Sequence, residues 1–193
     1  MDNINGQLYS ISELAKAPRC THVEVFTERN LFKGYTTHAI DERFLDILNQ
    51  GSKIKPKLIR DFLHLFEVEI YDLSGRKEEV TANCLLNKNN IWVVAESRIA
   101  GGELPPSKPF KYTSFRRKKP VSVNIHIQDL TVVGQVYINQ DGESITALEM
   151  DNIFIPVTNA TLVSKSNYSY FEFVFIAVNK NQITSISELS KSV

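Results

Sequence analysis

The chain repeats part of its own sequence, and the repeated part has the pattern of a β-hairpin. Alternating apolar residues and a glycine at 23–34 recur one hundred positions later at 123–134. Alternation over five positions, then a turn and a second apolar run, is typical of two antiparallel strands with one buried face. The glycine within the second run, Gly34 or Gly134, predicts a bulge or a sharp bend.

A second pair of similar segments follows in the same order. Residues 84–91 resemble residues 176–183, at an offset of 92. Each contains an Asn-Lys-Asn triplet, which predicts a turn because asparagine tolerates left-handed backbone and hydrogen-bonds to its own neighbours. Two matches in the same order indicate an internal duplication. The residues that we predict to form equivalent structural bends and turns are Gly34, Gly134, Asn87, Lys88, Asn179 and Lys180.

The duplication predicts a mainly β protein with short helices, organised as two tandem small β-barrels. We expect a first module at residues 1–100, a basic linker rich in proline and glycine at 101–119, and a second module at 120–193. Modules of this size are small but can still enclose a hydrophobic core.

Three short helices accompany the predicted strands. Capping-box spacing, with serine at the cap and glutamate three residues on, predicts an N-terminal helix from Ser10 and a C-terminal helix from Ser185. A third helix is predicted as an insertion at 55–66, where Pro56 suits a first helical position. The apolar residues that share one face of this inserted helix are Leu58, Ile59, Phe62, Leu65 and Phe66.

The sequence contains no motif that points to catalysis, a metal or a cofactor. Cys20 and Cys84 lack metal-ligand spacing, and the four histidines form neither HxH nor HExxH. No apolar run approaches the ~20 residues of a membrane span, and the first residues do not read as a signal peptide. We therefore expect a soluble, cytoplasmic protein that is not an enzyme and needs no metal or cofactor.

The predicted linker contains the chain's most concentrated charge. Residues 105–119 contain six Lys or Arg and no acidic residue, although the whole chain has a net charge of zero. Basic residues interleaved with aromatic ones suit phosphate neutralisation with base stacking, an acidic protein surface or anionic lipid headgroups. The alternative is a solvated connector whose aromatic residues pack onto the barrels. The candidate partner-binding residues are Phe110, Lys111, Tyr112, Phe115, Arg116, Arg117, Lys118 and Lys119.

The two modules resemble Sm-like small β-barrels of the Sm/SH3-like type. In that family an alternating first block runs to a glycine in a bent second strand, with an acidic residue further on. The second block is a strand, a tight turn and a final strand. Residues 23–34 with Asp41, and then 86–94, are similar to these blocks, and 123–134 and 178–186 repeat them. The tandem arrangement also resembles an uncharacterised bacterial family of duplicated β-domains.

The resemblance implies the fold more strongly than it implies RNA binding. Members of the family that bind RNA use an arginine–glycine turn and an aspartate-to-asparagine loop. Here Asn87-Lys88 and Asn179-Lys180 replace that turn, and residues 139–146 do not restore the loop.

Three functions remain open at this point. The first is a regulatory or scaffolding protein that binds another protein, or itself, through duplicated barrels. The alternative is an Sm-like protein that binds RNA or single-stranded nucleic acid through the basic segment. The third and weakest is a cyclic-dinucleotide site, because residues 129–134 after Arg116-Arg117 resemble the PilZ signature. Against it, the equivalent residues 29–34 share only the glycine, and the arginine spacing differs.

Overall fold

β-strands make up most of the chain that this computed structural model describes. The described residues are 19–39, 41–51, 60–97, 118–142, 144–148, 151–165 and 169–189. The strands of the first half are β1 (Arg19–Thr27), β2 (Asn30–His38), β3 (Phe62–Asp72), β4 (Lys77–Asn87) and β5 (Ile91–Glu96). Those of the second half are β6 (Lys118–Ile127), β7 (Leu130–Asn139), β8 (Phe154–Ser164), β9 (Tyr170–Asn179) and β10 (Ser185–Glu188). The prediction of a mainly β protein is confirmed.

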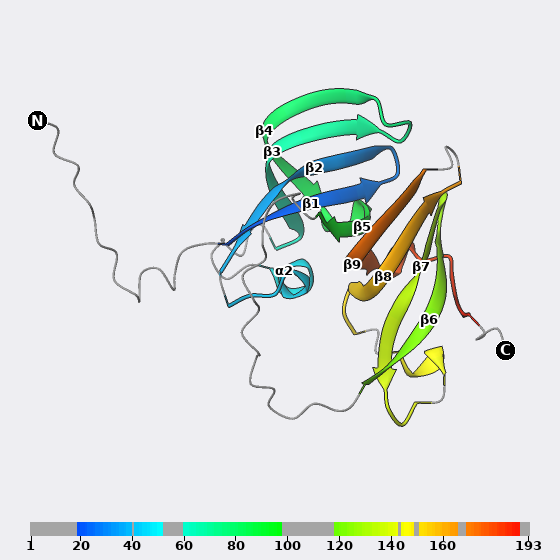
Figure 1. Ribbon diagram of the computed structural model, residues 1–193. Helices are drawn as coiled ribbons and strands as arrows, with labels where there is room; N and C mark the ends of the chain where they lie inside the picture. The colour runs from blue at the N-terminus through cyan, green and yellow to red at the C-terminus, as the bar shows by residue number, and fades with distance from the viewer. Residues whose placement is uncertain are drawn as a thin grey trace, which may run out of the picture.

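Short helical elements connect some of these strands. The α-helix α2 (Phe44–Gln50) lies between β2 and β3, and it packs beneath the first half (Figure 1). Single turns of 3-10 helix follow β4 as η2 (Lys88–Asn90), β7 as η3 (Ile145–Ala147) and β9 as η4 (Lys180–Gln182). None of the described helices is long and apolar enough to cross a membrane.

The strands form one open sheet, so the prediction of two closed barrels is wrong. The order of the ten strands is β10-β6-β7-β8-β9-β5-β1-β2-β3-β4. The first strand of each half pairs with the fifth: β1 with β5, and β6 with β10. The fourth strand does not pair with the fifth in either half, since β4 does not contact β5 in the sheet and β9 does not contact β10. The free side of β5 pairs with β9 instead, which joins the halves and leaves both unclosed (Figure 1).

The two halves share their strand order and their register. Val23 pairs with Gly34 as Val123 pairs with Gly134, at an offset of 100. Beyond β2 and β7 the offset becomes 92, as the pairs Phe66–Asn83 and Thr158–Phe175 show. The change of offset falls between the second and third strands, where the first half contains α2.

The predicted inserted helix is wrong where the structure describes it. Residues 62–66 belong to β3, while 52–59 lie outside the described residues. Helical spacing grouped Phe62, Leu65 and Phe66, but the side chains that point into the core are Leu63 and Leu65, two residues apart. A period of two is that of a strand, and pairing with β4 over the whole length of β3 satisfies its backbone groups.

The predicted C-terminal helix is also wrong over Ser185–Glu188, which forms β10. This strand pairs antiparallel with β6, from Ser185 opposite His126 to Glu188 opposite Val123. The Glu188 carboxylate accepts a hydrogen bond from the Ile145 backbone N–H, so it does not cap a helix. The predicted N-terminal helix lies outside the described residues.

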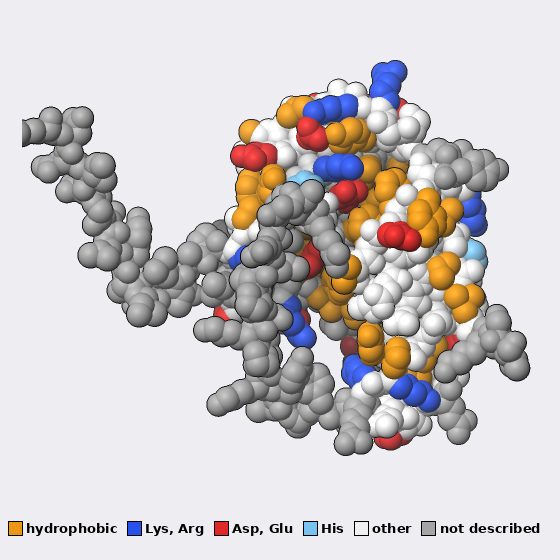
Figure 2. All heavy atoms as spheres, viewed as in Figure 1, with side chains coloured by type: hydrophobic (Ala, Val, Ile, Leu, Met, Phe, Trp, Pro, Cys, Tyr) orange, Lys and Arg blue, Asp and Glu red, His pale blue; other side chains and the backbone are white. Residues whose placement is uncertain are grey.

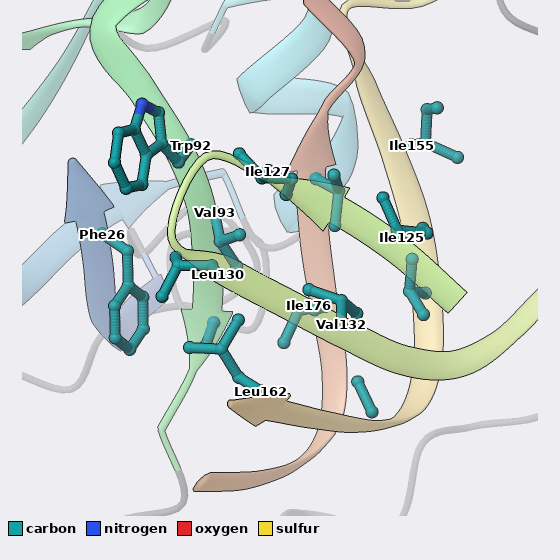
Figure 3. Packing of buried hydrophobic residues seen from close by; sticks show 14 of the residues in the cluster. Phe26, Trp92, Val93, Ile125, Ile127, Leu130, Val132, Ile155, Leu162 and Ile176 are labelled. Atoms are coloured by element: carbon teal, nitrogen blue, oxygen red, sulfur yellow. The ribbon is translucent and has the colours of Figure 1, made fainter. Parts of the chain in front are cut away.

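Two hydrophobic clusters form the core, and each draws on both halves. The larger cluster combines β6, β7 and β8 residues such as Ile125 and Val132 with Phe26 and Trp92 of the first half (Figure 3). The smaller cluster centres on Val23, Val25 and α2, and it includes Phe154 and Ala177 of the second half. Both halves therefore contribute to each cluster, and β5 is buried along Ile91–Ala95 because both of its faces are covered.

Candidate functional site

The predicted basic segment falls mostly outside the described residues. Phe110, Lys111, Tyr112, Phe115, Arg116 and Arg117 lie in that part of the chain. Lys118 and Lys119 are the first two residues of β6, where they pair with Asn139 and Ile138. Lys118 is exposed and Lys119 is half-buried, so the last two residues of the predicted linker belong to a strand.

Gly34 and Gly134 occupy tight positions where the ladder changes register. A Cβ on Gly34 would lie 3.1 Å from the Phe66 carbonyl oxygen, and one on Gly134 would lie 2.6 Å from Val157 Cγ1. The pairing shifts just after Lys33 in β2 and just after Val133 in β7. The neighbouring strand thus leaves little room for a Cβ at Gly34, and at Gly134 a Cβ would force the Val157 side chain to shift.

The asparagines at 87 and 179 begin equivalent 3-10 turns. The Asn87 side-chain oxygen accepts a hydrogen bond from the Asn89 N–H at 2.9 Å, and that of Asn179 accepts one from the Asn181 N–H at 3.0 Å. Lys88 and Lys180 are the first residues of these turns. Side-chain capping of this kind explains why Asn-Lys-Asn ends a strand in both places.

A seam of strand pairing and buried amides joins the two halves. Val93, Val94 and Ala95 of β5 pair with Val178, Ala177 and Ile176 of β9, and all six residues are fully buried. Next to this pairing, Asn179 Nδ2 donates to the carbonyl oxygens of Lys88 at 3.1 Å and Ile91 at 2.9 Å.

Two further side chains bond across the seam. Gln182 Nε2 donates to the Asn89 carbonyl oxygen at 2.7 Å. Asn49 of α2 exchanges two hydrogen bonds with the backbone of Phe154: its Nδ2 donates at 3.1 Å and its Oδ1 accepts at 2.8 Å. These contacts fix the halves in one relative position, because each satisfies a backbone group of the opposite half.

Lys88 is buried beneath the seam. Its Nζ donates to the Ile47 carbonyl oxygen at 2.9 Å, near the C-terminus of α2. Burial lowers the pKa of Lys88 to about 8, while the nearby Asp61 carboxylate opposes this shift. The Lys88 ammonium thus provides a hydrogen bond to a carbonyl oxygen near the C-terminus of α2, although burial disfavours its charged form.

A groove of about 710 Å³ lies between β1–β2 and the outer parts of β8–β9. Hydrophobic and charged side chains lie close together on this face of the molecule (Figure 2). On the first-half wall, Glu24 Oε1 lies 3.5 Å from Lys33 Nζ and accepts a hydrogen bond from Ser97 at 3.4 Å. The opposite wall contains Phe171 and Phe173, whose rings stack with centroids 6.4 Å apart.

His38 and Glu96 are further titratable groups in the described ranges. His38 is buried, with Nε2 3.0 Å from Thr21 Oγ1 and Nδ1 2.9 Å from the Ala39 carbonyl oxygen. Burial raises the pKa of Glu96, although Arg19 and His38 oppose the shift. Cys20 and Cys84 are free thiols, and no group of three or more metal-ligating side chains comes together among these residues.

β4 and β10 are the end strands of the sheet among the described residues, and β4 is the longer of the two. No other strand pairs with the outer edge of β4 in the part of the chain that the structure describes. Val80 is 64% exposed and Leu85 is 53% exposed, and Phe62 on the adjacent strand is 39% exposed. This combination of unpaired backbone and exposed apolar side chains is a surface that other strands can add to.

Sequence reasoning identified the turn asparagines but missed the seam. Nothing in the spacing of Asn49 or Gln182 marks them as contacts to the opposite half. One available signal was the unbroken apolar run at 91–95, which is typical of a strand covered on both faces.

Comparisons with protein-family models, with curated proteins and with solved structures found no match.

Proposed function

We propose that this chain is a non-catalytic scaffolding or regulatory protein that binds other proteins through two fused Sm-like units. One observation carries the proposal: large apolar side chains are exposed on β3 and β4, at one end of the sheet, and on the outer part of β9. They are Phe62, Val80, Leu85, Tyr170 and Val174. Exposed apolar groups that cluster on one set of strands mark interaction surfaces more often than scattered ones do.

The recurrence of strand order supports the view that the units are Sm-like duplicates. Both halves run fifth, first, second, third, fourth across the sheet, as β5-β1-β2-β3-β4 and β10-β6-β7-β8-β9. Both have a crowded glycine in the second strand and an asparagine-capped turn before the fifth. In this proposal both small barrels stay open. The reason is that β9, the fourth strand of the second unit, pairs with β5, the fifth strand of the first unit.

Two of the three described non-glycine residues with positive φ angles lie at matching positions as well. Glu67 in β3 has φ 51° and Asn159 in β8 has φ 48°, and the two are related by the offset of 92. Left-handed backbone is uncommon for residues other than glycine. Its recurrence at one register position therefore supports a common origin of the two units.

The proposal is tested by cross-linking in the cell from which the protein comes, followed by mass spectrometry. Wild-type protein should cross-link reproducibly to a small set of proteins. A variant with Val80→Lys and Val174→Lys should lose those cross-links while its melting temperature stays the same. Cross-links that are unchanged in this variant, or catalytic turnover by the purified chain, would contradict the proposal.

The salt dependence of binding distinguishes the alternative, a nucleic-acid-binding protein, from a protein-binding scaffold. Binding of RNA or single-stranded DNA by the purified chain is measured at two salt concentrations. Tight binding that weakens steeply with salt would favour a nucleic-acid-binding protein, since phosphate contacts release counterions.

A further inference from the structure

We propose that the groove between β1–β2 and the outer parts of β8–β9 binds an arginine side chain that a segment of another protein presents. The guanidinium lies against the aromatic rings of β9 and pairs with the carboxylate of Glu24. This inference rests on the proposed function, because it names the kind of partner that a protein-binding chain of this structure takes.

Glu24 brings an unsatisfied carboxylate oxygen to the groove. Its Oε2 is buried and has no hydrogen-bond partner, while its Oε1 lies 3.4 Å from Ser97 Oγ and 3.5 Å from Lys33 Nζ. Both distances exceed the about 2.7–2.9 Å of a well-formed charge-assisted hydrogen bond. The side chain is still 12% exposed, and the terminal torsion of a glutamate is soft, so the carboxylate can turn toward a donor in the groove. A ligand N–H would remove the cost of the unpaired oxygen.

The opposite wall of the groove offers flat aromatic surface. The half-buried rings of Phe171 and Phe173 lie 18° from parallel, with centroids 6.4 Å apart. Phe26 packs edge-on against both rings, at centroid distances of 5.8 and 6.4 Å, and so holds them in place. A guanidinium is planar and weakly hydrated, so it stacks on such rings while its N–H groups pair with a carboxylate.

The charges that line the groove favour a cation. Glu24, Glu96 and Glu172 line it, and Lys33 is the one basic residue among the described lining residues. Glu172 is exposed at the rim, where its carboxylate accepts a hydrogen bond from the Tyr170 hydroxyl at 2.9 Å. Three glutamates against one lysine attract a basic segment and repel the phosphates of a nucleic acid.

A guanidinium suits the groove better than a metal ion or an ammonium does. No group of three or more metal-ligating side chains comes together in the described part of the chain, so the glutamates there do not form a metal site. A lysine ammonium is a strongly hydrated point charge without a flat face to stack on a ring. The groove volume of about 710 Å³ is within the range of pockets that hold whole ligands, about 300–1,000 Å³. It therefore has room for one side chain and the backbone beside it.

The first test titrates the peptide acetyl-Ala-Arg-Ala-amide into the isotope-labelled full chain and follows the backbone amides by NMR. The amides of Ser97, Thr161 and Phe173 should shift saturably, with a dissociation constant of about 0.1–5 mM. The same peptide with citrulline keeps the shape of the side chain and loses its charge, so it should bind at least about tenfold more weakly. No saturable shifts up to about 10 mM, shifts confined to other residues, or equal binding of the citrulline peptide would overturn the inference.

Protein variants assign the binding to Glu24. Glu24→Gln keeps the size of the side chain and removes its charge, so the arginine peptide should bind at least about fivefold more weakly and the citrulline peptide about as before. The matched control is Glu79→Gln, an exposed position on β4 that changes the net charge equally. Equal affinities of these two variants for the arginine peptide would overturn the assignment. Phe173→Leu, which removes one ring of the wall, replaces Glu24→Gln if circular dichroism shows that the glutamine variant does not fold.

The chain's own basic residues are the rival occupant of the groove. Changing residues 116–119 together to serine should leave the affinity for the arginine peptide unchanged. Tighter binding in that variant would show that these residues compete for the groove, and the assignment to another protein would fail.

Cross-linking in the cell separates this inference from the proposed function. The proteins that cross-link to the wild type should be lost in Glu24→Gln and retained in Glu79→Gln. Cross-links that persist in Glu24→Gln but disappear in the variant with Val80→Lys and Val174→Lys would overturn this inference alone. Binding of the arginine peptide without reproducible cross-links in the cell would contradict the proposed function and support the groove as an arginine site.

Discussion

The side-chain amide of Asn179 donates two hydrogen bonds to the backbone of the opposite half, at the carbonyl oxygens of Lys88 and Ile91. Asn179 is fully buried, and its side-chain oxygen also caps the turn that follows β9. One residue thus closes a local turn and holds the two halves together. Its counterpart Asn87 caps the equivalent turn at the half-buried end of β4.

Asn179→Ala should destabilise the protein more than Asn87→Ala does. Asn179→Ala leaves two carbonyl oxygens beside the seam without this donor and also removes a cap, which should cost about 2–4 kcal/mol in total. Asn87→Ala removes a cap at a partly exposed site, which should cost about 0.5–1 kcal/mol. Urea unfolding measures both free energies. Equal losses would contradict the role of Asn179 in the seam.

Lys88 makes the stability depend on pH in the alkaline range. Its pKa is lowered from 10.5 to about 8, mainly by burial. Between these pH values the unfolded chain binds more protons at this residue than the folded chain does, so its contribution to the free energy of unfolding rises with pH. The rise should be about 1–3 kcal/mol across that window.

Lys88→Met serves as the reference for this effect, because methionine keeps the length of the side chain and does not titrate. Urea unfolding of both proteins is measured at about pH 7.5 and about pH 10. The difference in stability, wild type minus variant, should increase with pH. A difference that is constant or falls would contradict the lowered pKa of Lys88.

Gly134→Ala should be rescued in part by shortening the side chain that it meets. The new Cβ would lie 2.6 Å from Val157 Cγ1, so the substitution alone should cost about 1–3 kcal/mol. Val157→Ala removes that carbon. In the double variant the coupling energy should therefore be favourable by about 1 kcal/mol, measured by urea unfolding as a double-mutant cycle.

Gly34→Ala provides the contrast. Its nearest neighbour is the Phe66 carbonyl oxygen at 3.1 Å, which no side-chain truncation can remove. Val68→Ala should therefore rescue Gly34→Ala less than Val157→Ala rescues Gly134→Ala. Equal rescue in both double-mutant cycles would contradict the view that a backbone atom limits the space at Gly34 and a side-chain atom limits it at Gly134.

The sequence predicted the hairpins and turns, which depend on neighbouring residues, and missed the contacts between residues far apart in the chain. Alternation predicted the hairpin of β1 and β2, and Asn-Lys-Asn predicted the turns, because both depend on neighbouring residues. The helix predicted at 55–66 failed over residues 62–66, because the apolar residues at 58–66 fit both a helical and a strand period, and pairing of β3 with β4 decides between them there. Sequence alone could not place β9 beside β5, since Val93 and Val178 are far apart in the chain and their contact decides whether a barrel closes.

The basic residues at 116–119 offer a last test of function beyond the fold. Four consecutive cations repel one another, so a purely structural connector gains little from them. Changing Arg116, Arg117, Lys118 and Lys119 together to serine should leave the melting temperature within about 2 °C, because Lys118 is exposed and Lys119 is half-buried in β6.

Partner binding should weaken in this variant, whether the partner is an acidic protein or a nucleic acid. For single-stranded nucleic acid, the slope of log affinity against log salt should become shallower by about 0.7 for each phosphate that the protein no longer neutralises. The control changes four exposed cations elsewhere to serine, which alters the net charge equally: Arg29, Arg60, Arg76 and Lys165. If both quadruple variants weaken binding equally, the effect is one of net charge. If neither does, residues 116–119 take no part in binding.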